Sequence, residues 1–325
     1  MRELQDFVVS RLPGYQRARY IEFAQELPKR LRANFSASNS GSHRQEAGKA
    51  NLSDKTDSFF MTVRGQKLEV QRIPGERNDR PTLVFLHEGL GSVSLWRDFP
   101  SSIAAKTGCP VLVYSRYGHG NSDILDGPRN VNYMHDEAFN VLPKLLEKLS
   151  ICAPVLLGHS DGGSIALIYA GSHNRLEGLI LLAPHVFVEE ISVTSIAAAK
   201  VAFETTDLPV RMQRHHKDAK KTFWGWNNIW LHKDFRSWNI EECLPRITCP
   251  VLAIQGVDDE YGTMAQLEAI RSQTASPVEI VQLPNCKHSP HRDQPDQVLQ
   301  AVAVFIEKLA HAAPQGAARR IRKRA

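Results

Sequence analysis

Short aliphatic runs recur along this chain and limit its possible folds more than any other feature. Each run has the length and composition of a strand that is buried on both faces. Helix-like segments separate the runs, and an alternating stretch around a glycine at residues 58–75 indicates a β-hairpin before them. Strands that alternate with helices predict an α/β fold, with a mostly parallel central sheet and helices on both faces. The runs are TLVFLH, PVLVYS, PVLLGHS and GLILLAP between residues 82 and 184, then CPVLAIQG from Cys249 and PVEIVQLPN from Pro277.

This regular pattern covers residues 56–184 and 247–311, which we expect to form one α/β core. Residues 185–246 hold no strand-like run but several helix-like segments and four of the five tryptophans. About sixty residues make a marginal core alone, so this segment is interpreted as an inserted helical lid. Residues 1–55, which include a Ser-, Asn- and Gly-rich linker, predict a flexible N-terminal extension, and residues 312–325 predict a disordered basic tail.

The composition is that of an ordinary globular protein, with 42% hydrophobic and 23% charged residues. Five of the 40 Lys and Arg residues lie in the last seven positions, and the other 35 equal the 35 Asp and Glu residues in number. A nucleic-acid partner is therefore not expected. The five cysteines form no CxxC pair, and no signal-peptide core or 18-residue apolar run is present. We expect a cytoplasmic protein without a membrane partner.

A serine flanked by glycines lies where one strand-like run becomes a helix-like segment. In VLLGHSDGGSIAL, residues 155–167, Gly158 and Gly162 stand two positions before and after Ser160. At a sharp strand-to-helix turn the neighbours must be small, and the strained backbone pushes the hydroxyl above the edge of the sheet. The pattern favours Ser160 as a nucleophile over an ordinary turn serine.

A serine hydroxyl needs a base to activate it, and the base needs an acid to orient it. The segment VLAIQGVDDEYGT offers the carboxylates Asp258, Asp259 and Glu260 just after a strand-like run. The segment VQLPNCKHSPHRDQP offers His288 and His291 before the last helix. The order Ser, then Asp or Glu, then His suits a nucleophile at a strand-to-helix turn, but these patterns alone leave the three carboxylates and both imidazoles open.

Four features, in order, resemble the α/β-hydrolase superfamily over residues 58–311. They are LHEGLGSVSLW, SRYGHGNSD, GHSDGG, and the pair GVDDEYG with KHSPHRDQP. The resemblance implies that Ser160 is the nucleophile, His288 the general base and Asp259 the acid, with Asp258 as the alternative. It also implies an oxyanion hole made by the backbone N–H groups of Gly89 and Asp161.

Glu88 departs from the superfamily pattern, because glycine is usual at its position. It either changes the geometry of the loop or brings a carboxylate near the site. Together with the lid residues Trp224, Trp226 and Trp230, it is expected to line a substrate pocket that suits an apolar or aromatic acyl group. Two further pairs of histidines are expected to be structural: His87 and His119 in loops, and His215 and His216 on a solvated helix of the lid.

The leading hypothesis is a serine hydrolase that forms an acyl-enzyme and cleaves an ester, thioester or lactone of a small apolar acid. A second hypothesis is hydrolysis of a carbon–carbon bond in a ring-cleavage diketone, whose carboxylate Arg211 and Arg214 could hold. A third, from another class, is a ligand-binding protein on the same scaffold. No cofactor is expected, and no metal, because no His or acidic pair with zinc-type spacing has a third ligand beside it.

Overall fold

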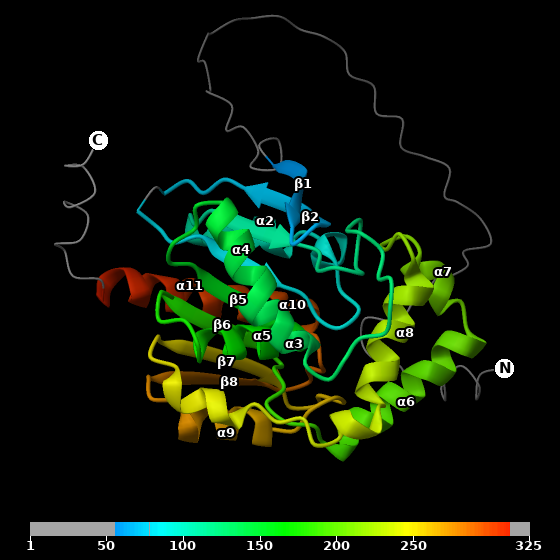
Figure 1. Ribbon diagram of the computed structural model, residues 1–325. Coiled ribbons are helices and arrows are strands. Elements are labelled where there is room, and N and C mark those ends of the chain that lie inside the picture. The colour runs from blue at the N-terminus through cyan, green and yellow to red at the C-terminus, as the bar shows by residue number, and fades with distance from the viewer. Residues whose placement is uncertain (1–55, 78, 313–325) are drawn as a thin grey trace, which may run out of the picture.

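The computed structural model describes residues 56–77 and 79–312. The predicted N-terminal extension and nearly all of the predicted basic tail lie outside these residues. An eight-stranded sheet forms the centre of the molecule, in the order β1-β2-β4-β3-β5-β6-β7-β8 (Figure 1). Strand β2 pairs antiparallel with β1 and β4, and all other neighbours are parallel. The strands are β1 (Asp57–Val63), β2 (Gln66–Ile73), β3 (Leu83–Leu86), β4 (Val111–Tyr114), β5 (Val155–His159), β6 (Gly178–Leu182), β7 (Val251–Gly256) and β8 (Val278–Leu283).

Helices cover both faces of the sheet, as the sequence predicts for strands that are apolar on both sides. Alternate residues of β3 enter different cores: Leu83 and Phe85 pack on the side of α2 and α11, while Val84 and Leu86 pack on the side of α4 and α5. The helices of the α/β core are α2 (Phe99–Thr107), α3 (Tyr133–Asp136), α4 (Leu142–Lys148), α5 (Asp161–Ala170), α9 (Ala265–Gln273), α10 (Pro290–Asp293) and α11 (Pro295–Ala312). A π-helical turn, Glu137–Val141, joins α3 to α4.

The segment between β6 and β7 is helical and lies to one side of the sheet, at the right of Figure 1. It contains α6 (Glu190–Thr205), α7 (Leu208–Met212) and α8 (Ala219–Trp230), followed by short 3₁₀ turns at 233–235 and 241–246. We call residues 185–246 the helical insertion. Its side chains Phe203, Phe223 and Trp230 belong to the same apolar cluster as α4 and α5, so it packs on the core as a continuation of it. In the described part of the chain, no helix combines the length and apolar character needed to cross a membrane.

Candidate active site

Ser160 lies at the turn from β5 to α5 with an unusual backbone conformation. Its φ is 53° and its ψ is −118°, a region that residues with a side chain rarely adopt. The flanking glycines make this turn possible. A Cβ on Gly162 would collide with the carbonyl of Leu86, and a Cβ on Gly158 would collide with the backbone of Gly162. The turn therefore requires glycine at both positions, for the steric reason that the sequence pattern indicated.

The structure brings Ser160, His288 and Asp259 into one hydrogen-bonded chain. Nε2 of His288 lies 2.9 Å from Oγ of Ser160, and its Nδ1 lies 2.9 Å from Oδ1 of Asp259. Ser160 follows β5, Asp259 follows β7 and His288 follows β8, so the carboxyl ends of three parallel strands supply the three groups at one edge of the sheet. The alternatives lie elsewhere: Asp258 is exposed, and His291 is buried against the rings of Trp96 and Phe99.

Asp259 and His288 each shift the pKa of the other toward its charged form. Burial alone would lower the pKa of His288, but the adjacent Asp259 carboxylate outweighs it and raises that pKa above its usual value. Burial alone would raise the pKa of Asp259, but His288 and the backbone N–H of Tyr261, which donates to Oδ1 at 2.8 Å, hold it below its usual value. The arrangement can therefore hold an ionised acid next to an imidazole that accepts a proton from Ser160.

The loop after β3 carries Glu88 and Gly89 to the rim of the same site. The Glu88 carboxylate lies 3.6 Å from Nδ1 of His159 and 4.0 Å from the guanidinium of Arg292. Burial would raise the pKa of Glu88, but His159 and Arg292 hold it well below its usual value. The Glu88 carboxylate therefore lies at the site, which is one of the two outcomes left open for this residue. Gly89 has no room for a side chain, because a Cβ there would collide with the ring of Trp226.

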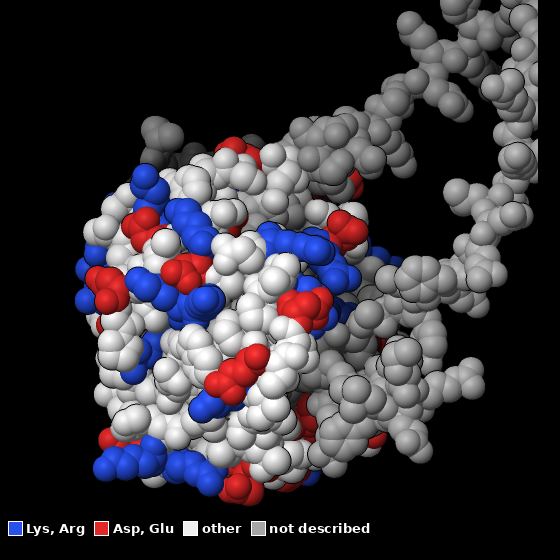
Figure 2. All heavy atoms as spheres, turned by 90° about the vertical axis from the view of Figure 1, so that its right-hand side faces the viewer, with Lys and Arg blue, Asp and Glu red and all other residues white. Residues whose placement is uncertain are grey.

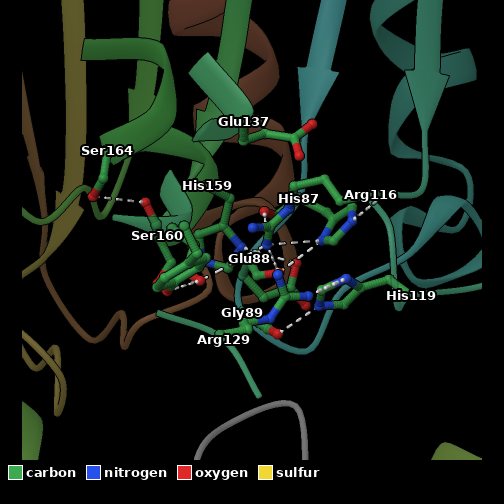
Figure 3. Close-up of polar contacts among 12 residues, drawn as sticks. His87, Glu88, Gly89, Arg116, His119, Arg129, Glu137, His159, Ser160 and Ser164 are labelled. Atoms are coloured by element: carbon green, nitrogen blue, oxygen red, sulfur yellow. Dashed lines mark hydrogen bonds and ion pairs between the residues drawn. The ribbon is translucent and has the colours of Figure 1, made fainter. Parts of the chain in front are cut away.

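A buried arginine that the sequence analysis did not single out connects the two segments that would form an oxyanion hole. Arg116 donates from Nη2 to the carbonyls of His87, at 3.1 Å, and Glu88, at 2.8 Å (Figure 3). The same Nη2 lies 3.8 Å from the carboxylate of Asp161, the first residue of α5. That carboxylate also accepts hydrogen bonds from the Tyr133 hydroxyl at 2.6 Å and from Nε1 of Trp230 at 3.2 Å. The only sequence signal was the position of Arg116 within SRYGHGNSD.

Histidines surround this site, and one of the expectations about them is wrong. His87 and His119 hold the loop as expected: Nε2 of His87 accepts from the Arg116 N–H, and Nε2 of His119 bonds the Gly89 carbonyl. His215 lies half-buried in a turn after α7. His216, which was expected on a solvated helix, is buried and joins the Gly120 N–H to the Leu90 carbonyl. The reason is that α7 ends at Met212, and the chain then turns inward.

A narrow cavity lies above Ser160 and His288. Its open volume is about 20 Å³, which is room for about one water molecule. Trp226 and Trp230 line it, but Trp224 does not; Trp224 borders a separate hollow of about 350 Å³ between the loop 125–129 and α8. His185, which no sequence pattern indicated, also lines the cavity; burial and the nearby His288 lower its pKa to about 3. Apart from Ser160, His288, Glu88, Gly89 and His159, the lining is mainly apolar and aromatic: Leu90, Ile196, Trp226, Trp230, Tyr261 and His185.

Known proteins share this fold. The sequence profile of the alpha/beta hydrolase family matches residues 83–301. The chain belongs to the alpha/beta hydrolase family. The predicted superfamily and fold are thereby confirmed. Among residues 56–77 and 79–312, no group of three or more His, Cys, Asp or Glu residues is arranged to hold a metal ion.

Individual relatives agree with this assignment. A proline iminopeptidase of Lactobacillus delbrueckii subsp. lactis is 38% identical over 98 residues, which cover 30% of this chain and 33% of that protein. The chain thus spans about a third of the length of such curated relatives. Two solved structures share the fold. A proline iminopeptidase of Mycobacterium smegmatis has a TM-score of 0.63 at 20% identity, covering 79% of this chain and 100% of the other. The enol-lactonase of Burkholderia xenovorans LB400 has a TM-score of 0.60 at 22% identity, covering 76% and 99%.

Proposed function

We propose that the protein is a serine hydrolase that acts through an acyl-enzyme at Ser160. His288 takes the proton of the Ser160 hydroxyl, and Oγ attacks the carbonyl carbon of the substrate. The N–H groups of Gly89 and Asp161 stabilise the negative charge on the carbonyl oxygen. His288 then gives its proton to the leaving group, and in the second half it activates a water that releases the acid. Asp259 keeps the imidazole oriented throughout.

One observation carries this proposal: the unbroken contact from Asp259 through His288 to Ser160, with 2.9 Å on each side of the imidazole. A serine that served only the turn would not need a base at hydrogen-bond distance and an acid behind that base. A ligand-binding protein on this scaffold would not need them either. The contact therefore supports the enzyme over the binding protein.

The substrate that this site suits best is an ester, thioester or lactone of a small apolar acid. The walls of the cavity are mainly apolar and aromatic, and its volume next to Ser160 is small. Ile196, Trp226 and Trp230 reach it from the helical insertion, so we propose that the insertion is a lid that moves to admit the substrate. The proline iminopeptidases and the enol-lactonase named above make amide and lactone substrates worth including in any test.

A time course with 4-nitrophenyl acetate tests the proposal. We expect a burst of one 4-nitrophenol per active site, labelling by a fluorophosphonate probe, and loss of both in Ser160→Ala. The matched control is Ser237→Ala, which removes the same hydroxyl from an exposed position. Wild-type protein that gives neither a burst nor labelling would overturn the acyl-enzyme mechanism and favour the binding protein. A panel of esters, thioesters, lactones, proline 4-nitroanilide and ring-cleavage diketones then identifies the bond.

A further inference from the structure

A second cavity adjoins the catalytic one and is rich in arginine. It has an open volume of about 220 Å³ and shares Glu88 and Leu90 with the cavity at Ser160. Three segments meet in it: α7 with the turn that follows it, the loop after β3, and α10, which begins two residues after His288. Figure 2 looks onto the side of the molecule where the insertion lies and shows several groups of Lys and Arg side chains, with Asp and Glu between them. The basic residues that line the cavity are Arg97, Arg211, Arg214, His215 and Arg292.

The acidic groups near this cavity leave two of its guanidinium groups uncompensated. Glu88 lies 4.0 Å from Arg292, and Asp207, outside the cavity, pairs with Arg211 at 2.7 Å. Arg97 and Arg214 form no ion pair with any residue of the described chain. A pocket with two such cations is a place where an anion binds favourably.

The imidazole of His215 lies among the guanidinium groups of this cavity. It is half-buried, and its Nδ1 lies 2.9 Å from the Ser94 hydroxyl. Its pKa is lowered first by burial, and then by Arg292, Arg97 and Arg214. Three guanidinium groups are therefore close enough to act on one ring. The rest of the wall is apolar and is formed by Leu90, Leu95, Leu208 and Met212.

We propose that this cavity binds an anionic group, a carboxylate or a phosphate, on the leaving-group side of the substrate. The inference rests on the proposed hydrolase function. The cavity above Ser160 has an open volume of only about 20 Å³, so the part of the substrate beyond its acyl group must extend away from it. The adjoining space is the arginine cavity, and its Arg292 follows His288, the group that protonates the leaving group, by four residues. The substrate class is thus a small acyl ester or thioester of an anionic alcohol or thiol, with apolar atoms between the ends.

Three aryl acetates that share the acetyl group and differ at the para position test this: phenyl acetate, 4-acetoxybenzoate and 4-acetoxyphenyl phosphate. We expect kcat/KM to be at least tenfold higher for one of the anionic esters than for the neutral one, and the better anion identifies carboxylate or phosphate. In Arg214→Gln and Arg97→Gln this preference should fall about tenfold each, mainly through KM, while phenyl acetate is hydrolysed as before. Arg236→Gln is the matched control, because Arg236 lies on the insertion but pairs with Glu190 outside the cavity.

Binding to Ser160→Ala separates this inference from the proposed function. We expect calorimetry to show that benzoate or phenyl phosphate binds to Ser160→Ala, and binds at least tenfold more weakly when Arg214→Gln is added. Hydrolysis of all three esters without preference, or a preference that Arg214→Gln and Arg97→Gln leave intact, would overturn the anion cavity alone. Absence of hydrolysis and of fluorophosphonate labelling would overturn the hydrolase, and the binding measurement would then still decide whether the cavity takes an anion.

Discussion

Replacement of Arg116 by methionine tests whether one buried cation holds the loop after β3 to α5. Arg116 and Asp161 are both 2% exposed in their side chains, and 3.8 Å separates Nη2 of Arg116 from Oδ2 of Asp161. The same Nη2 donates to the carbonyls of His87 and Glu88. Methionine keeps much of the length and volume of the side chain but has no N–H group. The substitution therefore removes all three interactions and little packing.

The loss of stability expected in Arg116→Met depends on the buried groups that lose their partner. Removing one partner of a buried ion pair costs about 3–5 kcal/mol, because the other charge stays buried without it. The two carbonyls also lose a charged donor. Asp161 retains its hydrogen bonds from Tyr133 and Trp230, which offset part of the loss. We expect Arg116→Met to lower the free energy of unfolding by about 3–5 kcal/mol, a large share of the usual 5–15 kcal/mol of a folded protein.

Urea unfolding of four proteins measures this: wild type, Arg116→Met, Asp161→Asn and the double variant. This double-mutant cycle should give a coupling free energy of about 1–3 kcal/mol between the two positions, because each single variant leaves the other group buried without its partner. Arg175→Gln, a change at an exposed arginine, should alter stability by less than about 0.5 kcal/mol. A loss of under about 1 kcal/mol in Arg116→Met, or strict additivity in the double variant, would refute the view that Arg116 joins the two segments.

Three further outcomes follow from the site. Asp259→Asn should lower kcat by about 10³- to 10⁴-fold with the fold intact, since the imidazole loses its orienting acid; a loss of under tenfold would contradict that role. The wild-type kcat/KM should rise with pH, and the midpoint of this rise should lie above pH 6.5, because Asp259 raises the pKa of His288 and only the neutral ring accepts the Ser160 proton. In Asp259→Asn this midpoint should move to lower pH. An unmoved midpoint would assign the rise to another group. Gly162→Ala should lower the free energy of unfolding, measured in urea, by about 1–3 kcal/mol. Gly127→Ala should lower it little, because a Cβ there meets nothing within 4 Å. Equal effects would show that the turn tolerates a side chain.

The features that the sequence predicts well are those set by local pattern and by strand order. Runs such as 155–159 become strands because both faces are apolar, and Ser160 is recognisable because Gly158 and Gly162 are required sterically. The segments that hold the candidate acids and histidines follow from their places after strand-like runs. The choice between Asp258 and Asp259 could not be made from the residues alone. Adjacent carboxylates are alike in sequence, and only the direction of the loop buries one of them against His288.

Features that depend on how the insertion packs were not predictable. Trp224 and Trp226 are two residues apart on α8, yet only Trp226 reaches the catalytic cavity, because residues at that spacing occupy different faces of a helix. His216 lies in a basic, polar stretch, and its burial depends on a turn after α7 that no periodicity indicates. Arg116 is a charge in the middle of a core, and its partners come from two segments, the loop after β3 and the start of α5. These contacts are long-range, so a one-dimensional pattern contains no trace of them.

Helix α8 contacts both residues that would supply the oxyanion hole. The ring of Trp226 occupies the space where Gly89 would carry a side chain, and Nε1 of Trp230 donates to the carboxylate of Asp161. Trp226 and Trp230 lie four residues apart, on one face of the helix, so they move together. A displacement of α8 that widened the cavity for a substrate would therefore also release both sides of the oxyanion hole. If the insertion closes over a bound substrate as proposed, that closure and the assembly of the proposed oxyanion hole would be one movement.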